Sequence, residues 1–335
     1  MSTRSSALHY LRAVAAAALG AAGCCSVPAA QPLDAPLGKP TRVKIAFVGD
    51  LQRTSGLELW REQNDAERPL IIDHIAANHP SLVVMLGDLV FDGSSECQWA
   101  AFDELVAPLR LARVPCVTAI GNHDLWSGGR DNLDFVFQRF PLLHRSTYRL
   151  ISMGEVAVVV LDSNHDEMPA ETWEAQKSWF AATLCAIDAN PAIRAAVVAL
   201  HHPPYANSTV TDDDPVIGAE LFPMFVARHK TVAMLAGHVH TYEHFDHHGK
   251  HLLVSGGGGG PRVTLTTGAD PDHQDLFDEL FPPPFRRPFH VVWLESGPDG
   301  LAFGVMGLPK GEQAFRLIDS FTVPWPSAAS PPHCP

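Results

Sequence analysis

Short, continuous apolar runs alternate with amphipathic stretches along most of the chain. Five such runs cover residues 43–48, 81–86, 114–120, 195–200 and 231–236, and Gly or His follows each one. Runs of this length that are rich in Val, Leu and Ile are typical of strands buried on both faces. Helical periodicity at 66–78, 96–106, 131–140, 172–187 and about 219–229 separates them. The pattern predicts an α/β fold.

Further apolar runs predict strands outside this set. Residues 147–152 and 156–161 flank a short turn and predict a hairpin, and 250–255, 289–295, 301–306 and 319–323 predict later strands. Residues 264–288 hold acids, three consecutive prolines and two arginines without a clear period. Long loops of this kind in compact domains are often functional lids, so we expect a lid here.

Side chains that can bind metal follow each of the first five runs. Ligand sites in α/β sheets collect at the carboxyl ends of strands, so we expect these side chains to meet at one edge. Residues two apart in an extended segment point the same way, which aligns the last two imidazoles. The candidate ligands are Asp50, Asp88, Asn122, His201, His238 and His240.

This set supplies three oxygen and three nitrogen ligands, a mixture that suits zinc, manganese or iron. Six ligands are too many for one tetrahedral zinc ion but suit two ions that share a carboxylate. Two ions about 3.5–4 Å apart can clamp a phosphate ester and hold a deprotonated water in line with it. The pattern therefore predicts a dinuclear centre that acts on phosphate esters.

Other polar residues near these motifs have predicted supporting roles. His123 is left beside the metals as a general acid for the leaving oxygen, and either Asp124 or Asp92 would orient it. We predict His202, Tyr205 and His244 as substrate contacts. The glycine run 256–260 lacks the Lys-Ser/Thr ending of a phosphate-binding loop, so it is expected to let the backbone pass close to the metals.

The net charge of the chain bears on which class of molecule it binds. The chain has 335 residues, enough for one large domain, and a formal net charge of −13. Nucleic-acid binding needs clustered Lys and Arg, so no nucleic-acid partner is expected. Affinity for phosphate must then come from local metal charge, and the expected partner is a small phosphate ester. Cys116 and Cys185 lie in apolar patterns and are expected to be free and buried.

The first residues resemble an export signal, with Arg4 and Arg12 beside an Ala-rich stretch that is too short to span a membrane. Residues 21–24 resemble a bacterial lipobox, which would place a lipid anchor on Cys24; cleavage after Ala29 or Ala30 is the alternative. The expected product is exported, as a membrane-anchored lipoprotein or a periplasmic or secreted protein. We predict a signal segment (1–30), a linker (31–41), a catalytic domain (42–325) and a Pro-rich tail (326–335).

The ordered motifs resemble the calcineurin-like metallophosphoesterase superfamily, and especially its purple acid phosphatase branch. The resemblance runs from about residue 43 to about residue 260 and depends on Gly49-Asp50, Gly87-Asp88, Gly121-Asn122-His123-Asp124, His201 and Gly237-His238-Val239-His240. It implies a four-layer αββα sandwich of two mixed sheets, with two divalent or mixed-valence ions (iron, manganese or zinc) at their edge.

The resemblance also implies a role for each ligand by its position in the motifs. Asp88 would bridge the two ions. Asp50 and His240 would hold the first ion, while Asn122, His201 and His238 would hold the second. His123 would be the acid or transition-state stabiliser.

Two positions depart from the patterns of this superfamily. Many members have His at the place of Gln52, and purple acid phosphatases have a ligating Tyr at the place of Phe91. The first ion therefore lacks its usual fourth protein ligand, although the amide oxygen of Gln52 can supply one. We expect weaker binding at the first metal position than at the second.

These features together predict an acid-phosphatase-like phosphomonoesterase in which a metal-activated hydroxide attacks phosphorus. Two alternatives stay open. One is a phosphodiesterase that acts on nucleotides or phospholipid headgroups. The other is a low-turnover protein that binds metal or phosphate, which the residues Gln52 and Phe91 motivate.

Phe91 generates a spectroscopic prediction. The colour of purple acid phosphatases is attributed to a tyrosinate bound to iron, and a phenyl ring cannot supply that ligand. The iron-loaded protein is therefore expected to show no charge-transfer band in its visible absorption spectrum. Phe91→Tyr is the matched variant, in which such a band can form. A visible band in the unmodified iron-loaded protein would contradict the prediction.

Overall fold

Two six-stranded mixed sheets lie face to face in the computed structural model, which describes residues 29–38, 40–56, 58–208, 210–265, 275–279 and 286–327. Residues 1–28 of the predicted signal segment, which include Cys24, lie outside these residues, and so does most of the predicted lid. Within the described residues, none of the helices is both long and apolar enough to cross a membrane.

The first sheet has the order β12-β11-β10-β1-β2-β3. Its parallel part consists of β1 (Lys44–Val48), β2 (Leu82–Met85) and β3 (Cys116–Thr118). Its antiparallel part consists of β10 (Phe289–Ser296), β11 (Gly300–Leu308) and β12 (Arg316–Pro324). All three parallel strands therefore end at the same edge.

The second sheet has the order β4-β5-β6-β7-β9-β8. Its four central strands are parallel: β5 (Val156–Val160), β6 (Ala195–Leu200), β7 (Thr231–Ala236) and β9 (Lys250–Ser255). The antiparallel strands β4 (Arg149–Met153) and β8 (Tyr242–His247) form its edges.

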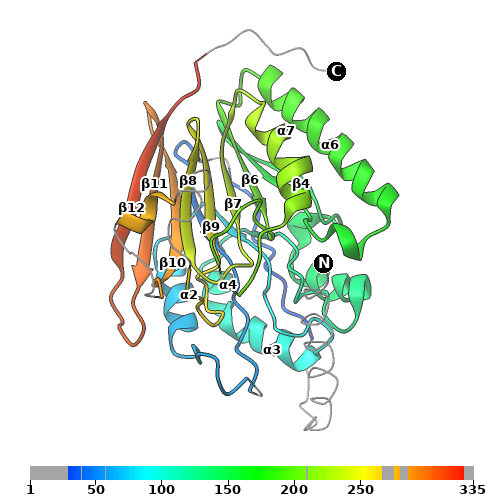
Figure 1. Ribbon diagram of the computed structural model, residues 1–335, viewed down its shortest axis with the longest axis vertical. Coiled ribbons are helices and arrows are strands. Elements are labelled where there is room, and N and C mark those ends of the chain that lie inside the picture. The colour runs from blue at the N-terminus through cyan, green and yellow to red at the C-terminus, as the bar shows by residue number, and fades with distance from the viewer. Residues whose placement is uncertain are drawn as a thin grey trace, which may run out of the picture.

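Helices cover the outer faces of both sheets (Figure 1). On the side of the first sheet lie α2 (Glu67–Ala77), α3 (Glu96–Leu105), α4 (Ala107–Leu111) and α5 (Leu133–Arg139). On the side of the second sheet lie α6 (Ala170–Ala189) and α7 (Phe222–Val226). Short helical turns occupy Gly129–Asn132, Pro141–Leu143, His165–Glu167, Ile217–Leu221 and Leu276–Glu279. The result is the four-layer αββα sandwich that the resemblance implied.

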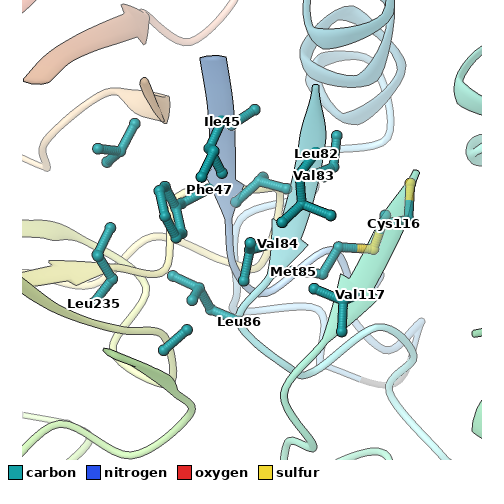
Figure 2. Packing of buried hydrophobic residues seen from close by; sticks show 14 of the residues in the cluster. Ile45, Phe47, Leu82, Val83, Val84, Met85, Leu86, Cys116, Val117 and Leu235 are labelled. Carbon is teal, nitrogen blue, oxygen red and sulfur yellow. The ribbon is translucent and has the colours of Figure 1, made fainter. Parts of the chain in front are cut away.

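The core explains why the strands read as continuous apolar runs. In β5, Val158 packs in the cluster shared by the two sheets, while its neighbour Val159 packs in a second cluster under α6. Figure 2 shows part of the shared cluster, in which Phe47 of β1 lies between Leu235 of β7 on one side and the side chains of β2 and β3 on the other. Because successive strand residues point to opposite faces, a strand with apolar layers on both sides shows no polar alternation.

The five strands that precede candidate ligands are confirmed, but they belong to different sheets. β1, β2 and β3 are in the first sheet, whereas β6 and β7 are in the second. The expectation of a single sheet edge was therefore wrong, because local periodicity does not say which strands pair. The sequence also missed β8, whose segment Tyr-Glu-His-Phe-Asp-His mixes polar and apolar residues.

The predicted state of the cysteines is confirmed at one position and wrong at another. Cys116 is buried and free, as expected. Cys185 is disulfide-bonded, as is Cys97, so the expectation of a free thiol at 185 was wrong. Its position in an amphipathic helix gave no signal of a partner.

Candidate metal centre

The carboxyl ends of the two sheets meet where the candidate ligands lie. Asp50, Asp88 and Asn122 follow strands of the first sheet, and the three histidines follow strands of the second. Nδ1–H of His201 donates to the Leu86 carbonyl oxygen across the gap (2.7 Å). The backbone N–H of His238 donates to both carboxylate oxygens of Asp50 (3.1 Å each). These bonds join the two edges into one site.

One group of ligand atoms comes from Asp50, Asp88 and His240. Their ligand atoms all lie within 4.8 Å of one another, and all three residues are buried. Nε2 of His240 is 3.3 Å from Oδ1 of Asp50. Its Nδ1–H donates to the Pro261 carbonyl oxygen (3.0 Å), which fixes the ring. These residues are the ones assigned to the first ion.

A second group surrounds Nε2 of His201. This nitrogen is 3.0 Å from Oδ1 of Asn122, 3.2 Å from Nδ1 of His238 and 3.3 Å from Oδ1 of Asp88. The Asp88 carboxylate therefore lies against both groups. All six predicted ligands come together around it.

The protonation of this cluster fits a cation site. Nδ1–H of both His201 and His240 is committed to a carbonyl oxygen, so each Nε2 of a neutral ring carries a lone pair. Each of these nitrogens faces a carboxylate oxygen at 3.3 Å. Two lone pairs at that separation repel unless a proton or a cation lies between them. The chemistry of the donor set therefore suits metal ions.

The pKa shifts of His201 and Asp88 show the same competition between burial and neighbouring charge. Burial opposes charge on His201, but the adjacent Asp88 carboxylate outweighs it and raises the pKa of His201 to about 9. Burial also opposes ionisation of Asp88, yet the neighbouring histidines hold the pKa of that carboxyl well below its usual range. Bound cations would replace these protons in balancing the buried carboxylates.

The backbone is strained at three of the ligands. Asp50 (φ 61°), Asp88 (φ 52°) and His238 (φ 67°) all adopt the left-handed conformation, which is uncommon for residues other than glycine. Such strain persists only where surrounding contacts hold it, and it gathers at functional sites. Here each of the three residues lies in the loop that directly follows a strand, at the edge where the candidate ligands meet.

Two glycines allow the close packing around the ligands. A Cβ at Gly121 would lie 2.2 Å from Oδ1 of Asp88, and a Cβ at Gly260 would lie 2.6 Å from the His240 ring. The N–H of Gly260 also donates to the Asp50 carbonyl oxygen (2.8 Å). The glycine run 256–260 thus passes against the ligands, as its composition predicted.

Gln52 is buried beside the shared carboxylate. With its amide oriented to satisfy its neighbours, the side-chain nitrogen donates to Oδ2 of Asp88 (2.9 Å) and to the Asp88 carbonyl oxygen (3.1 Å). The sequence predicted a ligand role for the amide oxygen, whereas the observed contact uses the nitrogen. In this orientation Gln52 fixes the Asp88 carboxylate.

His123 is positioned by a backbone carbonyl. Its Nδ1–H donates to the Phe91 carbonyl oxygen (2.6 Å), and its ring packs against Phe91 and Trp126. Its backbone N–H donates to Oδ1 of Asp88 (2.9 Å). Burial lowers the pKa of His123 despite the nearby Asp88 carboxylate. Nε2 is the ring nitrogen left for a substrate.

The expectation that Asp124 or Asp92 orients His123 was wrong. Asp124 is fully buried and accepts the backbone N–H groups of Gly121 (2.9 Å), Asp88 (3.1 Å) and Leu89 (2.8 Å). Burial, with the neighbouring Asp88 charge, raises its pKa to about 7. Asp92 accepts from the backbone N–H and hydroxyl of Ser94. Asp124 thus fastens the Asp88 loop to the Asn122 loop, and Asp92 stabilises a turn.

The three predicted substrate contacts lie in different surroundings. A ring nitrogen of His202 lies within 4.8 Å of the ligand nitrogens of His201 and His238. Tyr205 packs against Phe222 and Phe245 in the apolar cluster of the second sheet. Nδ1 of His244 pairs with Asp319 (2.9 Å) and Nε2 with His251 (2.9 Å), so neither nitrogen is left for a substrate. Only His202 lies among the ligands.

Sequence reasoning missed Ser163, which contacts His202. Its Oγ lies 2.8 Å from Nδ1 of His202. A signal was present, because polar residues Asp162, Ser163 and Asn164 follow the apolar run 156–161 just as ligands follow the other strands. The positions of the Phe91, Leu86 and Pro261 carbonyl oxygens had no such signal.

Comparison with known proteins identifies the family. The family model described as calcineurin-like phosphoesterase matches residues 43–242, which span every candidate ligand. The chain belongs to the calcineurin-like phosphoesterase family. This confirms the resemblance seen in the five motifs.

Within this family the chain is similar to plant purple acid phosphatases. Purple acid phosphatase 18 of Arabidopsis thaliana is 24% identical over 217 residues, which are 60% of this chain and 44% of that protein. Purple acid phosphatase 23 of the same plant is 25% identical over 234 residues, which are 60% of this chain and 47% of that protein. The chain spans about half the length of the curated relatives it matches.

Solved structures share the fold. A purple acid phosphatase from yellow lupin (Lupinus luteus) has a TM-score of 0.65 at 16% identity, covering 88% of this chain and 55% of that one. A dimetal phosphatase from Danio rerio has a TM-score of 0.54 at 14% identity, and the match covers 84% of this chain and 99% of that one. GAP50, the anchor in the inner membrane complex of Plasmodium, has a TM-score of 0.63 at 14% identity, and the match covers 85% of this chain and 89% of that one.

Asp124 gives a prediction about metal affinity. In Asp124→Asn the new amide cannot accept every backbone N–H that the carboxylate binds, so the Asp88 and Asn122 loops lose their common anchor. We expect manganese binding, measured by calorimetry, to weaken by about 10–100-fold, the range for groups that orient ligands. The control Asp92→Asn removes a carboxylate that only stabilises a turn and is expected to bind like the unmodified protein. Unchanged affinity in Asp124→Asn would contradict this role.

Proposed function

We propose that the chain is a metal-dependent phosphoesterase that hydrolyses phosphomonoesters with two cations. One observation carries the proposal: all six predicted ligands meet in two groups that share the Asp88 carboxylate. The family match and the similarity to purple acid phosphatases support the same chemistry. Since the family fold also occurs in an anchor protein, GAP50, the side-chain geometry is the stronger support.

The proposed metal assignment follows the two groups. Asp50, Asp88 and His240 would hold one ion, and Asp88, Asn122, His201 and His238 would hold the other. When bound, such a pair of divalent ions would neutralise phosphate charge and lower the pKa of a water molecule beside it. The donor set suits manganese, zinc or iron. Gln52 would orient the shared carboxylate through its amide nitrogen.

His123 would assist the departure of the alcohol. The Phe91 carbonyl oxygen holds Nδ1–H, so Nε2 is the atom that would carry the proton to the leaving oxygen. Packing against Phe91 and Trp126 holds the ring in place and excludes water from one side of it. The formal net charge of −13 provides no long-range attraction for an anion, so affinity for phosphate would be local.

We also propose that the protein is exported. The support is the signal-like sequence of residues 1–30 and the disulfide bonding of Cys97 and Cys185. Disulfides persist in oxidising compartments and are rare in the cytosol. A lipid on Cys24 remains part of this proposal.

A pair of variants separates metal binding from catalysis. With manganese and an aryl phosphomonoester, Asp88→Ala is expected to lose both bound metal and activity, because both groups lose a ligand. His123→Ala is expected to keep its metal while kcat falls by about 100-fold or more, the usual loss on removing a general acid. Metal content is measured by elemental analysis, and His248→Asn at an exposed turn is the control.

The results also separate the alternative functions. Hydrolysis of an aryl phosphodiester in preference to the monoester would replace our proposal with a phosphodiesterase. Metal binding without turnover of either ester would replace it with a binding protein. Full activity in Asp88→Ala would contradict the proposed site.

A further inference from the structure

His202 lies among the ligands without a settled role. Its ring centroid is 4.4 Å from that of His238 and 4.8 Å from that of His201. One of its ring nitrogens lies within 4.8 Å of the ligand nitrogens of both. Proximity alone would make His202 a third imidazole ligand. Its hydrogen bonds point to a different role.

Ser163 determines where the proton of His202 lies. Ser163 is 1% exposed, and its Oγ accepts the backbone N–H of His202 (2.9 Å). The same Oγ is 2.8 Å from Nδ1 of His202. The hydroxyl hydrogen needs an acceptor, and Nδ1 is the one within hydrogen-bond distance in the described part of the chain. The serine O–H therefore donates to Nδ1.

This bond gives His202 the opposite tautomer to His201 and His240. An imidazole that accepts at Nδ1 carries its hydrogen on Nε2. His201 and His240 donate from Nδ1 to carbonyl oxygens, which leaves a lone pair on Nε2 for a cation. A nitrogen that carries hydrogen cannot ligate a metal, but it can donate to an anion.

We propose that Ser163 is a positioning residue that holds His202 as a hydrogen-bond donor to a phosphate oxygen bound beside His201 and His238. His202 is then a substrate-binding residue and not a metal ligand. The proposal rests on the proposed function for the identity of the anion. It assigns opposite roles to the adjacent histidines 201 and 202.

The tautomer is measured directly by long-range ¹H–¹⁵N NMR of histidine-labelled protein loaded with zinc, which is diamagnetic. His202, assigned through the signal lost in His202→Gln, is expected to show hydrogen on Nε2. Ser163→Ala is expected to lose that preference, and Ser163→Thr, which retains a hydroxyl, is expected to restore it. A lone pair on Nε2 in the unmodified protein would overturn the proposal.

Binding measurements separate a donor from a ligand. By calorimetry, His202→Gln is expected to bind zinc like the unmodified protein, whereas His201→Ala loses zinc. Affinity of the zinc-loaded His202→Gln variant for inorganic phosphate is expected to fall about tenfold or more, the usual effect of losing a hydrogen bond to a charged group. Loss of zinc in His202→Gln, or unchanged phosphate affinity, would overturn the proposal.

These readouts do not depend on turnover. If the unmodified protein hydrolyses no ester, the proposed function fails, while the tautomer and the phosphate affinity still decide the role of His202. If the protein is an active phosphatase but Nε2 of His202 carries no hydrogen, the proposed function stands and this inference fails.

Discussion

The site depends on one buried carboxylate that needs positive charge from two sides. Asp88 is about 1% exposed, and its oxygens contact His201, the Gln52 amide and the backbone N–H of His123. An isolated buried carboxylate is costly, so the surrounding groups must supply donors or cations. Gln52 and the backbone N–H of His123 supply neutral donors, and in the proposed site two cations, one on each side, would supply the positive charge.

The two-sheet architecture makes this arrangement possible. Three parallel strands of the first sheet bring oxygen ligands to its edge, and β6 and β7 of the second sheet bring imidazoles to the facing edge. Asp50, Asp88 and His238, which lie just after these strands, adopt left-handed conformations. Asp124 fastens two of the loops through their backbone N–H groups.

The sequence predicted the ligands because each one directly follows a buried apolar run, a local pattern that can be read without knowing the fold. It did not predict what holds them in place, because backbone carbonyl oxygens such as those of Leu86 and Pro261 leave no mark on the residue type. The sequence also could not show which groups His244 contacts. We predicted it as a substrate contact, yet its Nδ1 is hydrogen-bonded to Asp319 of β12, which is distant in the sequence. The sequence also did not show that β6 and β7 belong to a second sheet, because the periodicity of a strand does not say which strands it pairs with.

We propose that these six side chains surround two cations that share Asp88, and anomalous scattering from manganese-soaked crystals would show whether they do. We expect two manganese peaks about 3.5–4 Å apart, the usual separation in dinuclear sites. One would lie beside Asp50 and His240, and the other beside Asn122, His201 and His238. No manganese peak between the two sheet edges, or peaks bound by other side chains, would contradict it.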